Sequence, residues 1–141
     1  MLPNYDVEMR LDVKVPMRDG VELSADIYLP RGEGKFPTVL MRTPYSNNVP
    51  DMIEKGRRLA SNGYVCVTQD CRGRWDSGGE YYPFREGEDG HDTQEWIGRQ
   101  EWSDGKIGMA GGSYVGTVQW QSAPHRSEFL KCIAPRVICC D

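Results

Sequence analysis

The stretch "KIGMAGGSYVGTVQWQSA", residues 106–123, decides the fold. Residues 106–110 form a short apolar run typical of a buried strand, and residues 113–123 follow with a helical pattern. Gly111 and Gly112 make the turn between them, and Ser113 lies at the corner. A serine in this place either caps the helix or is presented as a nucleophile.

The neighbours of this serine favour a nucleophile without excluding a cap. A serine at a sharp strand-to-helix turn needs small neighbours, and Gly111, Gly112 and Gly116 meet that need. The helix N-terminus can also stabilise an oxyanion. The usual fingerprint is G-x-S-x-G, but here Val115 stands at the second glycine and Gly116 comes one place later. A helix cap with close helix–strand packing explains the same residues. A phosphate cradle is disfavoured, because neither G-K-[ST] nor G-x-G-x-x-G is present.

Composition narrows the class of protein. The chain has 141 residues, with 17 Lys and Arg against 21 Asp and Glu, a formal net charge of −4. This length indicates at most one domain, 1–141, able to bury a core. An acidic balance without a basic cluster argues against nucleic acid as the partner. No apolar run approaches the roughly 20 residues that span a membrane, and the start lacks the pattern of a secretory signal.

The cysteines and histidines indicate neither disulfides nor a metal. The five cysteines are odd in number and form no C-x-x-C pair, and several lie in apolar, strand-like runs. We expect free buried thiols and a reducing, cytoplasmic location. His91 and His125 are not at ligand spacing, so we expect no metal and no cofactor. The cysteines are Cys66, Cys71, Cys132, Cys139 and Cys140.

The pattern along the chain predicts an α/β domain. Alternating residues predict an antiparallel hairpin of 7–17 and 21–30 around a turn at 18–20. From residue 37 on, short apolar runs alternate with helical patterns, which predicts a mostly parallel sheet. The expected strands are 37–42, 64–70, 106–110 and 130–137, the expected helices are 51–63, 91–100 and 113–123, and a long loop is expected over 71–90. Because the chain stops just after a strand, we expect this fold to be incomplete at its C-terminal side.

Motifs spread over the chain resemble one family of α/β-hydrolases, which includes cocaine esterase, X-prolyl dipeptidyl peptidases and α-amino-acid ester hydrolases. The resemblance runs from about Val15 to Pro135. The motifs are "VPMRDGVELSADIYLP", "VLMRTPY", "QDCRGRWDSGGEYYPF", "EGEDGHDTQEWIGRQEWSDGKIGMAGGSYVGTVQWQSA" and "LKCIAP". Each motif alone is unspecific, but their combination in this order is highly specific. The resemblance implies the α/β-hydrolase fold.

The resemblance also implies catalytic roles. Ser113 would attack an ester or amide carbonyl and form an acyl-enzyme. The backbone N–H of Tyr114 would be one oxyanion donor, and the hydroxyl of Tyr45, in the Arg-x-Pro-Tyr motif, would be the other. The expected substrate is a small-molecule ester or a peptide, of an acyl or X-prolyl dipeptidyl type. The sequence leaves the substrate and the oligomeric state open, with a homo-oligomer of the full-length protein as one alternative.

Other conspicuous residues have simpler interpretations. We expect the polar and small residues after the central strand to tie down a loop, and three tryptophans to pack the core around the elbow. The loop residues are Asp70, Arg72, Gly73 and Ser77, and the tryptophans are Trp96, Trp102 and Trp120.

The base that a serine nucleophile needs is missing from the sequence. In α/β-hydrolases the acid and the histidine follow the serine. His125 is the one histidine after Ser113, and a helix between them would separate the two by roughly 18 Å, at about 1.5 Å per residue. His91 precedes the elbow. Two hypotheses follow. The chain is the N-terminal part of a serine hydrolase that is inactive in this truncated form, without the family's helical cap and C-terminal β-sandwich. Alternatively, it is a non-catalytic remnant that acts as a binding or assembly module.

Overall fold

One six-stranded sheet organises the molecule. The computed structural model describes residues 4–138. The strand order is β1-β2-β4-β3-β5-β6. The strands are β1 (Val7–Pro16), β2 (Glu22–Pro30), β3 (Phe36–Thr43), β4 (Val65–Asp70), β5 (Ser103–Gly112) and β6 (Leu130–Arg136). The helices are α1 (Pro50–Ser61), α2 (Gly87–Gly98) and α3 (Tyr114–Ser122), followed by a 3-10 turn, η1 (Ala123–His125).

The pairing confirms the predicted α/β architecture. Strands β1 and β2 form the N-terminal antiparallel hairpin, and β2 also pairs antiparallel with β4. The pairs β3–β4, β3–β5 and β5–β6 are all parallel. Thr43 at the end of β3 lies opposite Asp70 at the end of β4. The carboxyl ends of the parallel strands therefore meet at one edge of the sheet, where ligands bind in open α/β sheets.

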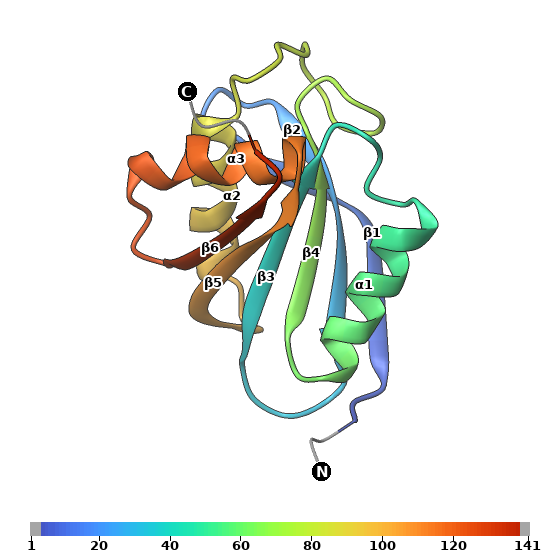
Figure 1. The fold of residues 1–141 in the computed structure, drawn as a ribbon. Coiled ribbons are helices and arrows are strands. Elements are labelled where there is room, and N and C mark those ends of the chain that lie inside the picture. Colours follow the sequence, from blue (N-terminus) through green and yellow to red (C-terminus); the bar gives the residue numbers. More distant parts are fainter. Residues whose placement is uncertain (1–3, 139–141) are drawn as a thin grey trace.

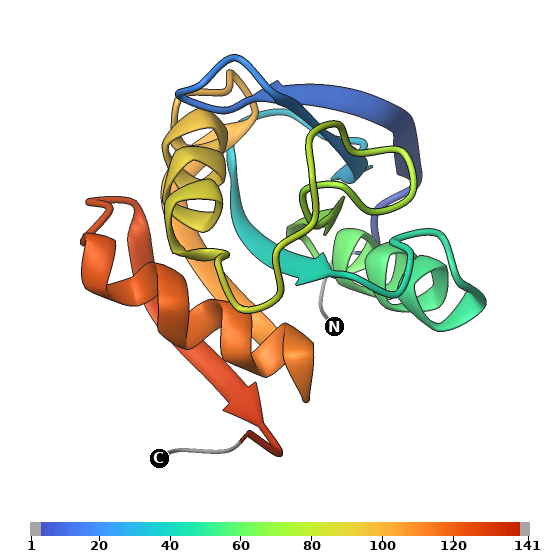
Figure 2. The ribbon, with the colours of Figure 1, turned by 90° about the horizontal axis from the view of Figure 1, so that it is seen from above.

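The sheet is covered on both faces (Figures 1 and 2). Helix α1 packs on one face, and α2 and α3 pack on the other. The sequence of β4 explains this, because successive side chains of a strand point to opposite faces. Val65 and Val67 join the core under α2 and α3, whereas Cys66 joins the core under α1. A strand buried on both faces has a continuous apolar sequence, as "VCV" does here.

Helix α2 begins earlier than predicted. The sequence pattern predicts a loop over residues 71–90, but α2 begins at Gly87. A Cβ atom added at Gly87 would lie 2.6 Å from the carbonyl oxygen of Gln121, and one at Gly90 would lie 2.6 Å from the Cβ of Ser122. These glycines let α2 pack closely on α3. They indicate helix contact at this place, and they do not break the helix.

The expectations about the tryptophans and the cysteines were correct only in part. Trp102 is buried and packs edge-on against Trp96, with 6.4 Å between ring centroids, as a core tryptophan should. Both lie near the start of β5, far from the elbow at its other end, and Trp120 is 51% exposed on the outer side of α3. Cys66 and Cys71 are buried as expected, but Cys132 is exposed.

The exposure of Cys132 follows from its strand. Within residues 4–138, β6 pairs with β5 alone and is an edge strand, so its side chains are only partly covered. Cys139 and Cys140 lie outside the described residues. In the described part of the chain, no helix has the length and apolar character to cross a membrane.

Candidate active site

The backbone of Ser113 has an unusual conformation, and its side chain is exposed at the turn. It follows β5 directly, precedes α3, and adopts φ 55° and ψ −129°. A residue other than glycine rarely adopts a positive φ, and such strain concentrates at functional sites. The Ser113 N–H donates to the carbonyl of Arg136 at 2.9 Å, and its own carbonyl accepts from the N–H of Gly116 at 2.9 Å. Its side chain makes no capping bond to α3 and is exposed. The alternative of a simple helix cap is therefore not what the geometry shows.

The glycines around this serine are required by close contacts. Gly111 has φ 140°, and a Cβ there would lie 2.2 Å from a methyl carbon of Val115. At Gly116 a Cβ would lie 2.5 Å from the side chain of Ile138 and 3.1 Å from the carbonyl oxygen of Arg136. The end of β6 and the residues after it thus come closest to α3 at position 116. This contact explains why the second glycine stands one place later than in the usual fingerprint.

The first turn of α3 leaves donors at the corner. The Tyr114 N–H begins the helix, and it donates to no backbone or side-chain acceptor among the described residues. The first N–H groups of a helix have no partner within the helix, and they carry the positive end of its dipole. The N–H of Tyr114 is therefore available to an oxygen that develops negative charge beside Ser113.

Tyr45 lies at the same edge of the sheet. It follows β3 in the loop 44–49, and its backbone N–H donates to Oγ1 of Thr43 at 3.0 Å. Its ring is 56% exposed and meets the ring of Tyr114 edge-on, with 6.4 Å between centroids and 73° between planes. A cavity of about 210 Å³ is lined by Tyr45, Gly111, Gly112 and Val115, among others. The structure thus brings together the residues on either side of Ser113 and the predicted phenol donor.

The loop that carries this tyrosine is fixed by bonds that sequence reasoning missed. The carbonyl of Pro44 accepts from Nε of Arg74 at 3.0 Å and from Nε1 of Trp75 at 3.2 Å. The Asn47 N–H donates to Oδ1 of Asp70 at 2.7 Å. Residues on both sides of Tyr45 are therefore held by the end of β4 and the segment that follows it. The only signal in the sequence was the cluster of donors in "DCRGRW".

A buried ion pair lies behind the elbow, and it too was missed. Nη2 of Arg42 lies 3.0 Å from Oε2 of Glu86, and both side chains are almost completely buried. Nε of Arg42 donates to Oε1 of Gln69 at 2.6 Å. The other carboxylate oxygen of Glu86 accepts from the hydroxyl of Tyr114 at 3.2 Å. This chain of bonds connects β3, β4 and α3 behind the site.

The loop after β4 is tied down as expected. Both terminal nitrogens of Arg72 reach carboxylates, with Nη1 at 2.8 Å from Asp19 and Nη2 at 2.7 Å from Asp89. Oγ of Ser77 donates to the carbonyl of Asp70 at 2.7 Å. Gly73 has φ 67°, and a Cβ there would lie 2.3 Å from the backbone nitrogen of Tyr81. These residues hold the loop, and the prediction of a structural role for them is confirmed.

Comparison with known proteins places this geometry in a family. A family model described as X-Pro dipeptidyl-peptidase (S15 family) matches residues 19–141. The chain belongs to the S15 family. The cocaine esterase of Rhodococcus sp. (strain MB1 Bresler) is 42% identical over 147 residues, which cover 98% of this chain and 25% of that protein.

Solved structures agree with this membership of the S15 family. A CocE/NonD family hydrolase from Staphylococcus aureus superimposes with a TM-score of 0.81 at 31% identity, over 90% of this chain and 27% of that one. An α-amino acid ester hydrolase gives a TM-score of 0.80 at 30% identity, over 94% of this chain and 25% of that one. The chain thus has the α/β-hydrolase fold and spans about a quarter of the length of the relatives that it matches.

The histidines of this S15 chain lie away from the elbow. His125 ends the 3-10 turn after α3, at the opposite end of that helix from Ser113. Its ring lies 6.1 Å from the ring of His91, which is part of α2. Nδ1 of His91 is 3.5 Å from Oδ1 of Asp92. Among residues 4–138, no three His, Cys, Asp or Glu side chains are placed to hold a metal ion.

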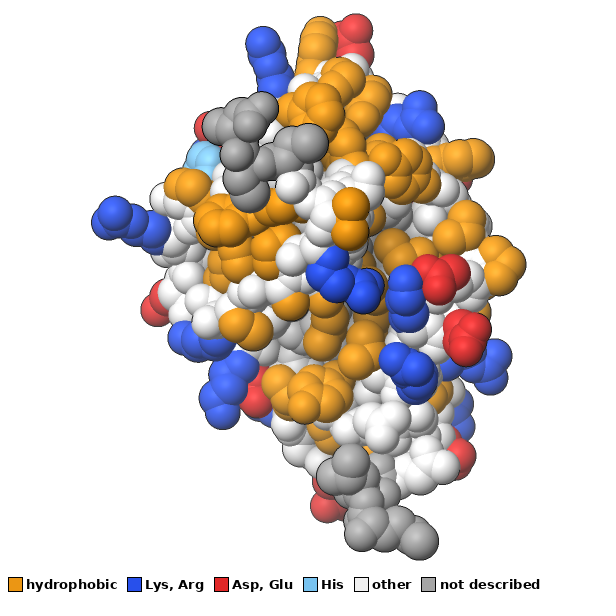
Figure 3. Space-filling view, in the orientation of Figure 1, with side chains coloured by type: hydrophobic (Ala, Val, Ile, Leu, Met, Phe, Trp, Pro, Cys, Tyr) orange, Lys and Arg blue, Asp and Glu red, His pale blue; other side chains and the backbone are white. Residues whose placement is uncertain are grey.

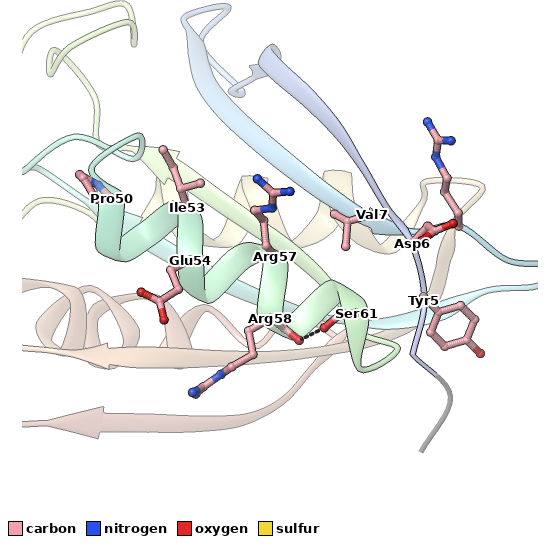
Figure 4. Close-up of a pocket in the computed structure, with 10 residues that line it drawn as sticks. Tyr5, Asp6, Val7, Pro50, Ile53, Glu54, Arg57, Arg58 and Ser61 are labelled. Carbon is pink, nitrogen blue, oxygen red and sulfur yellow. Dashed lines mark hydrogen bonds between the residues drawn. The ribbon is translucent and has the colours of Figure 1, made fainter. Parts of the chain in front are cut away.

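A larger groove lies elsewhere on the molecule. Its volume is about 1070 Å³, and it runs between α1 and the segment that enters β1. Figure 4 shows Ile53 and Arg57 on the side of α1 that faces β1, whereas Glu54 and Arg58 point away. None of its lining residues comes from β5, α3 or the loop 44–49. We therefore place the candidate site at the smaller cavity, beside the strained serine.

Aromatic side chains are exposed around this candidate site. Figure 3 shows hydrophobic side chains gathered at the upper end of the molecule, where Figure 1 places the loops after β3 and β4. The large exposed aromatic residues of these loops are Tyr45, Trp75, Tyr82 and Phe84. An exposed apolar patch beside a candidate nucleophile is suited to bind the apolar part of a substrate or to be covered by further protein.

Asp70 gives a test of the electrostatics at this edge. Burial raises its pKa to about 6, and Oδ2 has no hydrogen-bond partner among the described residues. The unfolded pKa is about 3.9, so the folded state binds the extra proton and stability falls as the pH rises from about 4 to about 6. Over that interval, titration of Asp70 should lower the parent's free energy of unfolding by roughly 2–3 kcal/mol, and Asp70→Asn should remove this loss. Urea unfolding of both proteins at pH 4 and pH 7 measures it.

The informative quantity is the difference between the two proteins, because other carboxyl groups titrate in the same interval. The pKa of Asp26 is also raised, mainly by burial, whereas hydrogen bonds with Lys14 and Ser24 lower the pKa of Asp12. An Asn variant that is less stable than the parent at pH 7, by as much as at pH 4, would contradict the raised pKa of Asp70.

Proposed function

We propose that residues 1–141 are the N-terminal part of the catalytic domain of a serine hydrolase, which cleaves an ester or an amide through an acyl-enzyme on Ser113. The observation that supports this most is the backbone of Ser113, with φ 55° and ψ −129°, at a corner where its side chain is exposed and makes no capping bond. A strained, exposed serine between a strand and a helix is the arrangement of a nucleophile elbow.

The proposed chemistry is acyl transfer in two steps. Oγ of Ser113 attacks the carbonyl carbon, its proton passes to a base, and the carbonyl oxygen becomes an oxyanion. The N–H of Tyr114 and the hydroxyl of Tyr45 would donate to that oxyanion. The alcohol or amine leaves with the proton from the base. Water then attacks the acyl-serine and releases the acid, which restores the serine hydroxyl.

The proposed mechanism also needs a histidine base and an acid that orients it, and residues 1–141 place no histidine beside Ser113. The chain contains two histidines, and both lie on α2 or beyond the end of α3. We propose that residues after Asp141 supply the histidine and the acid, and that residues 1–141 are inactive by themselves. The lengths of the relatives support this, since the chain spans 25% of the cocaine esterase.

The first experiment is to sequence the coding region beyond Asp141. The proposal expects an open reading frame of several hundred further codons, with an aspartate and then a histidine late in the sequence. A stop codon directly after Asp141 would overturn the proposal for this chain. It would favour the second candidate, a non-catalytic binding or assembly module. That module would cover the open edge at β6, and sedimentation analysis would then show a dimer or a larger assembly.

The substrate and setting complete the proposal. We propose a small-molecule ester or a peptide as the substrate. The family is described as an X-Pro dipeptidyl-peptidase, and the relative is named as an esterase. A cytoplasmic location is proposed from the free, buried thiols of Cys66 and Cys71. A homo-oligomer of the full-length protein remains an alternative to a monomer.

The oxyanion role of Tyr45 is testable by removing one oxygen atom. We expect Tyr45→Phe to lower kcat of the complete gene product by about 10²–10³-fold, because a lost oxyanion donor costs roughly 2.7–4 kcal/mol. KM should change little, since the bond forms in the transition state. Steady-state kinetics on a chromogenic ester measures both. Thr43→Val, which removes only a hydroxyl that supports the loop, is the matched control and should retain most of kcat. Equal losses in the two variants would contradict the role.

A further inference from the structure

The side chain of Tyr114 has no role in the chemistry described so far, although its backbone does. The ring lies in the core with an exposed fraction of 8%. It is tilted against the ring of Phe84, with 5.1 Å between centroids, and it meets the ring of Tyr45 edge-on. One residue therefore offers a backbone N–H at the elbow and touches, through its side chain, the residue that carries the second donor.

The hydroxyl end of this side chain is fixed at two points. It accepts from the N–H of Phe84 at 2.9 Å and donates to Oε1 of Glu86 at 3.2 Å. Glu86 is itself held by the buried Arg42, whose Nη1 donates to the Glu86 carbonyl at 3.1 Å. Burial raises the pKa of the Tyr114 hydroxyl, which therefore stays protonated and able to donate. Because every partner is buried or is backbone, the ring has little freedom to shift.

Tyr45, in contrast, is fixed mainly through its backbone. Its loop is tethered at Pro44 and Asn47, but no described residue makes a hydrogen bond with its hydroxyl. Its ring is more than half exposed and has the ring of Tyr114 as its aromatic neighbour. An edge-to-face contact of this kind favours one orientation of the ring over the others.

We propose that the side chain of Tyr114 is a positioning residue that holds the Tyr45 ring so that its hydroxyl points at the oxyanion. This inference rests on the proposed function. It assigns two separate roles to one residue: the backbone of Tyr114 donates directly, and its ring, anchored through Glu86 and Arg42, orients the other donor. Preorganised donors are the ones that stabilise a transition state, because they need no reorganisation during the reaction.

A double-mutant cycle on the complete gene product tests this role. Tyr114→Leu keeps the backbone N–H and removes the ring, and we expect it to lower kcat at least about tenfold with little change in KM. In a Tyr45→Phe background the same substitution should cost less than about twofold, since there is no hydroxyl left to orient. The two losses in kcat could instead multiply, so that Tyr114→Leu lowers kcat by the same factor with and without the Tyr45 hydroxyl. That result would overturn the proposal.

Trp102→Leu is the matched control. Trp102 is an aromatic residue with the same 8% exposed fraction, and it lies at the opposite end of β5 from the elbow. A purely structural loss there should act equally in the presence and absence of the Tyr45 hydroxyl. If Tyr114→Leu does not fold, Tyr114→Phe replaces it in the cycle, because it keeps the ring and removes only the anchoring hydroxyl.

A second measurement does not depend on activity. The ring protons of Tyr45 lie against the ring of Tyr114, so Tyr114→Leu should shift their NMR resonances, and Trp102→Leu should not. Unchanged Tyr45 resonances in Tyr114→Leu would overturn the contact. Ser113→Ala in the same kinetic assay separates the two proposals. If it retains turnover, the proposed function fails, whereas an additive cycle with an inactive Ser113→Ala variant rejects only the positioning role.

Discussion

Ser113→Ala is expected to abolish turnover by the complete gene product, with a loss in kcat of about 10⁶-fold. The reason is chemical. The variant would lack the oxygen that is proposed to form the acyl-enzyme, while the proposed donors at Tyr114 and Tyr45 would remain and provide only residual catalysis. The measurement is the steady-state rate on an activated ester, together with mass spectrometry after a fluorophosphonate, which should label the parent protein at Ser113 and leave the variant unlabelled.

The same position allows a control that needs no activity. Alanine keeps the Cβ atom, so Ser113→Ala should retain the strain of φ 55° and unfold close to the parent's midpoint. Ser113→Gly removes that strain, which costs of order 1–3 kcal/mol, but makes the unfolded chain more flexible by roughly 0.5–1 kcal/mol. We therefore expect the glycine variant to be inactive yet more stable than the alanine variant. An active Ser113→Ala protein, or a glycine variant less stable than the alanine one, would contradict the elbow.

The fold could be predicted because its signals are local. The apolar run "VCV" is buried on both faces in β4, and the alternating residues of β1 and β2 form the hairpin. The errors arose where a local pattern has two meanings. Gly87 and Gly90 can end a helix or let it pack closely, and only the contact with α3 decides between them. Likewise, Trp120 has the apolar character of a core residue, but its place on the outer side of α3 exposes it.

The candidate site divides in the same way. Ser113 lies in a continuous motif, and Tyr45 entered through the family resemblance, so both could be named from the sequence. The residues that hold them could not. Arg42 and Glu86 are 44 positions apart, and each on its own is an ordinary charged residue of the kind that lies on the surface. Their pairing depends on the sheet order, which brings the end of β3 under the start of α2.

Glu86→Ala is expected to destabilise the protein by about 3–5 kcal/mol, the second large effect. The substitution leaves the guanidinium of Arg42 in the core, where its side chain is completely buried, without the carboxylate that compensates its charge. Gln69 still accepts from Nε of Arg42, but a neutral amide oxygen cannot balance the charge. Glu86→Ala also removes the carboxylate that accepts from the Tyr114 hydroxyl, so the anchor behind the elbow is lost with the ion pair. Urea denaturation, followed by tryptophan fluorescence, measures the loss.

Two further variants separate charge from shape at this pair. Glu86→Gln keeps an acceptor for Tyr114 and a similar volume, so it should lose less stability than Glu86→Ala while still leaving the Arg42 charge uncompensated. Arg42→Met in the Glu86→Ala background removes the remaining buried charge, and it should recover part of the loss, because apolar replacement of a whole buried pair is often neutral or stabilising. If adding Arg42→Met instead lowers stability by a further amount similar to that of the first substitution, the guanidinium is stabilised by Gln69 and the backbone of Glu86. In that case the carboxylate of Glu86 serves mainly to anchor Tyr114.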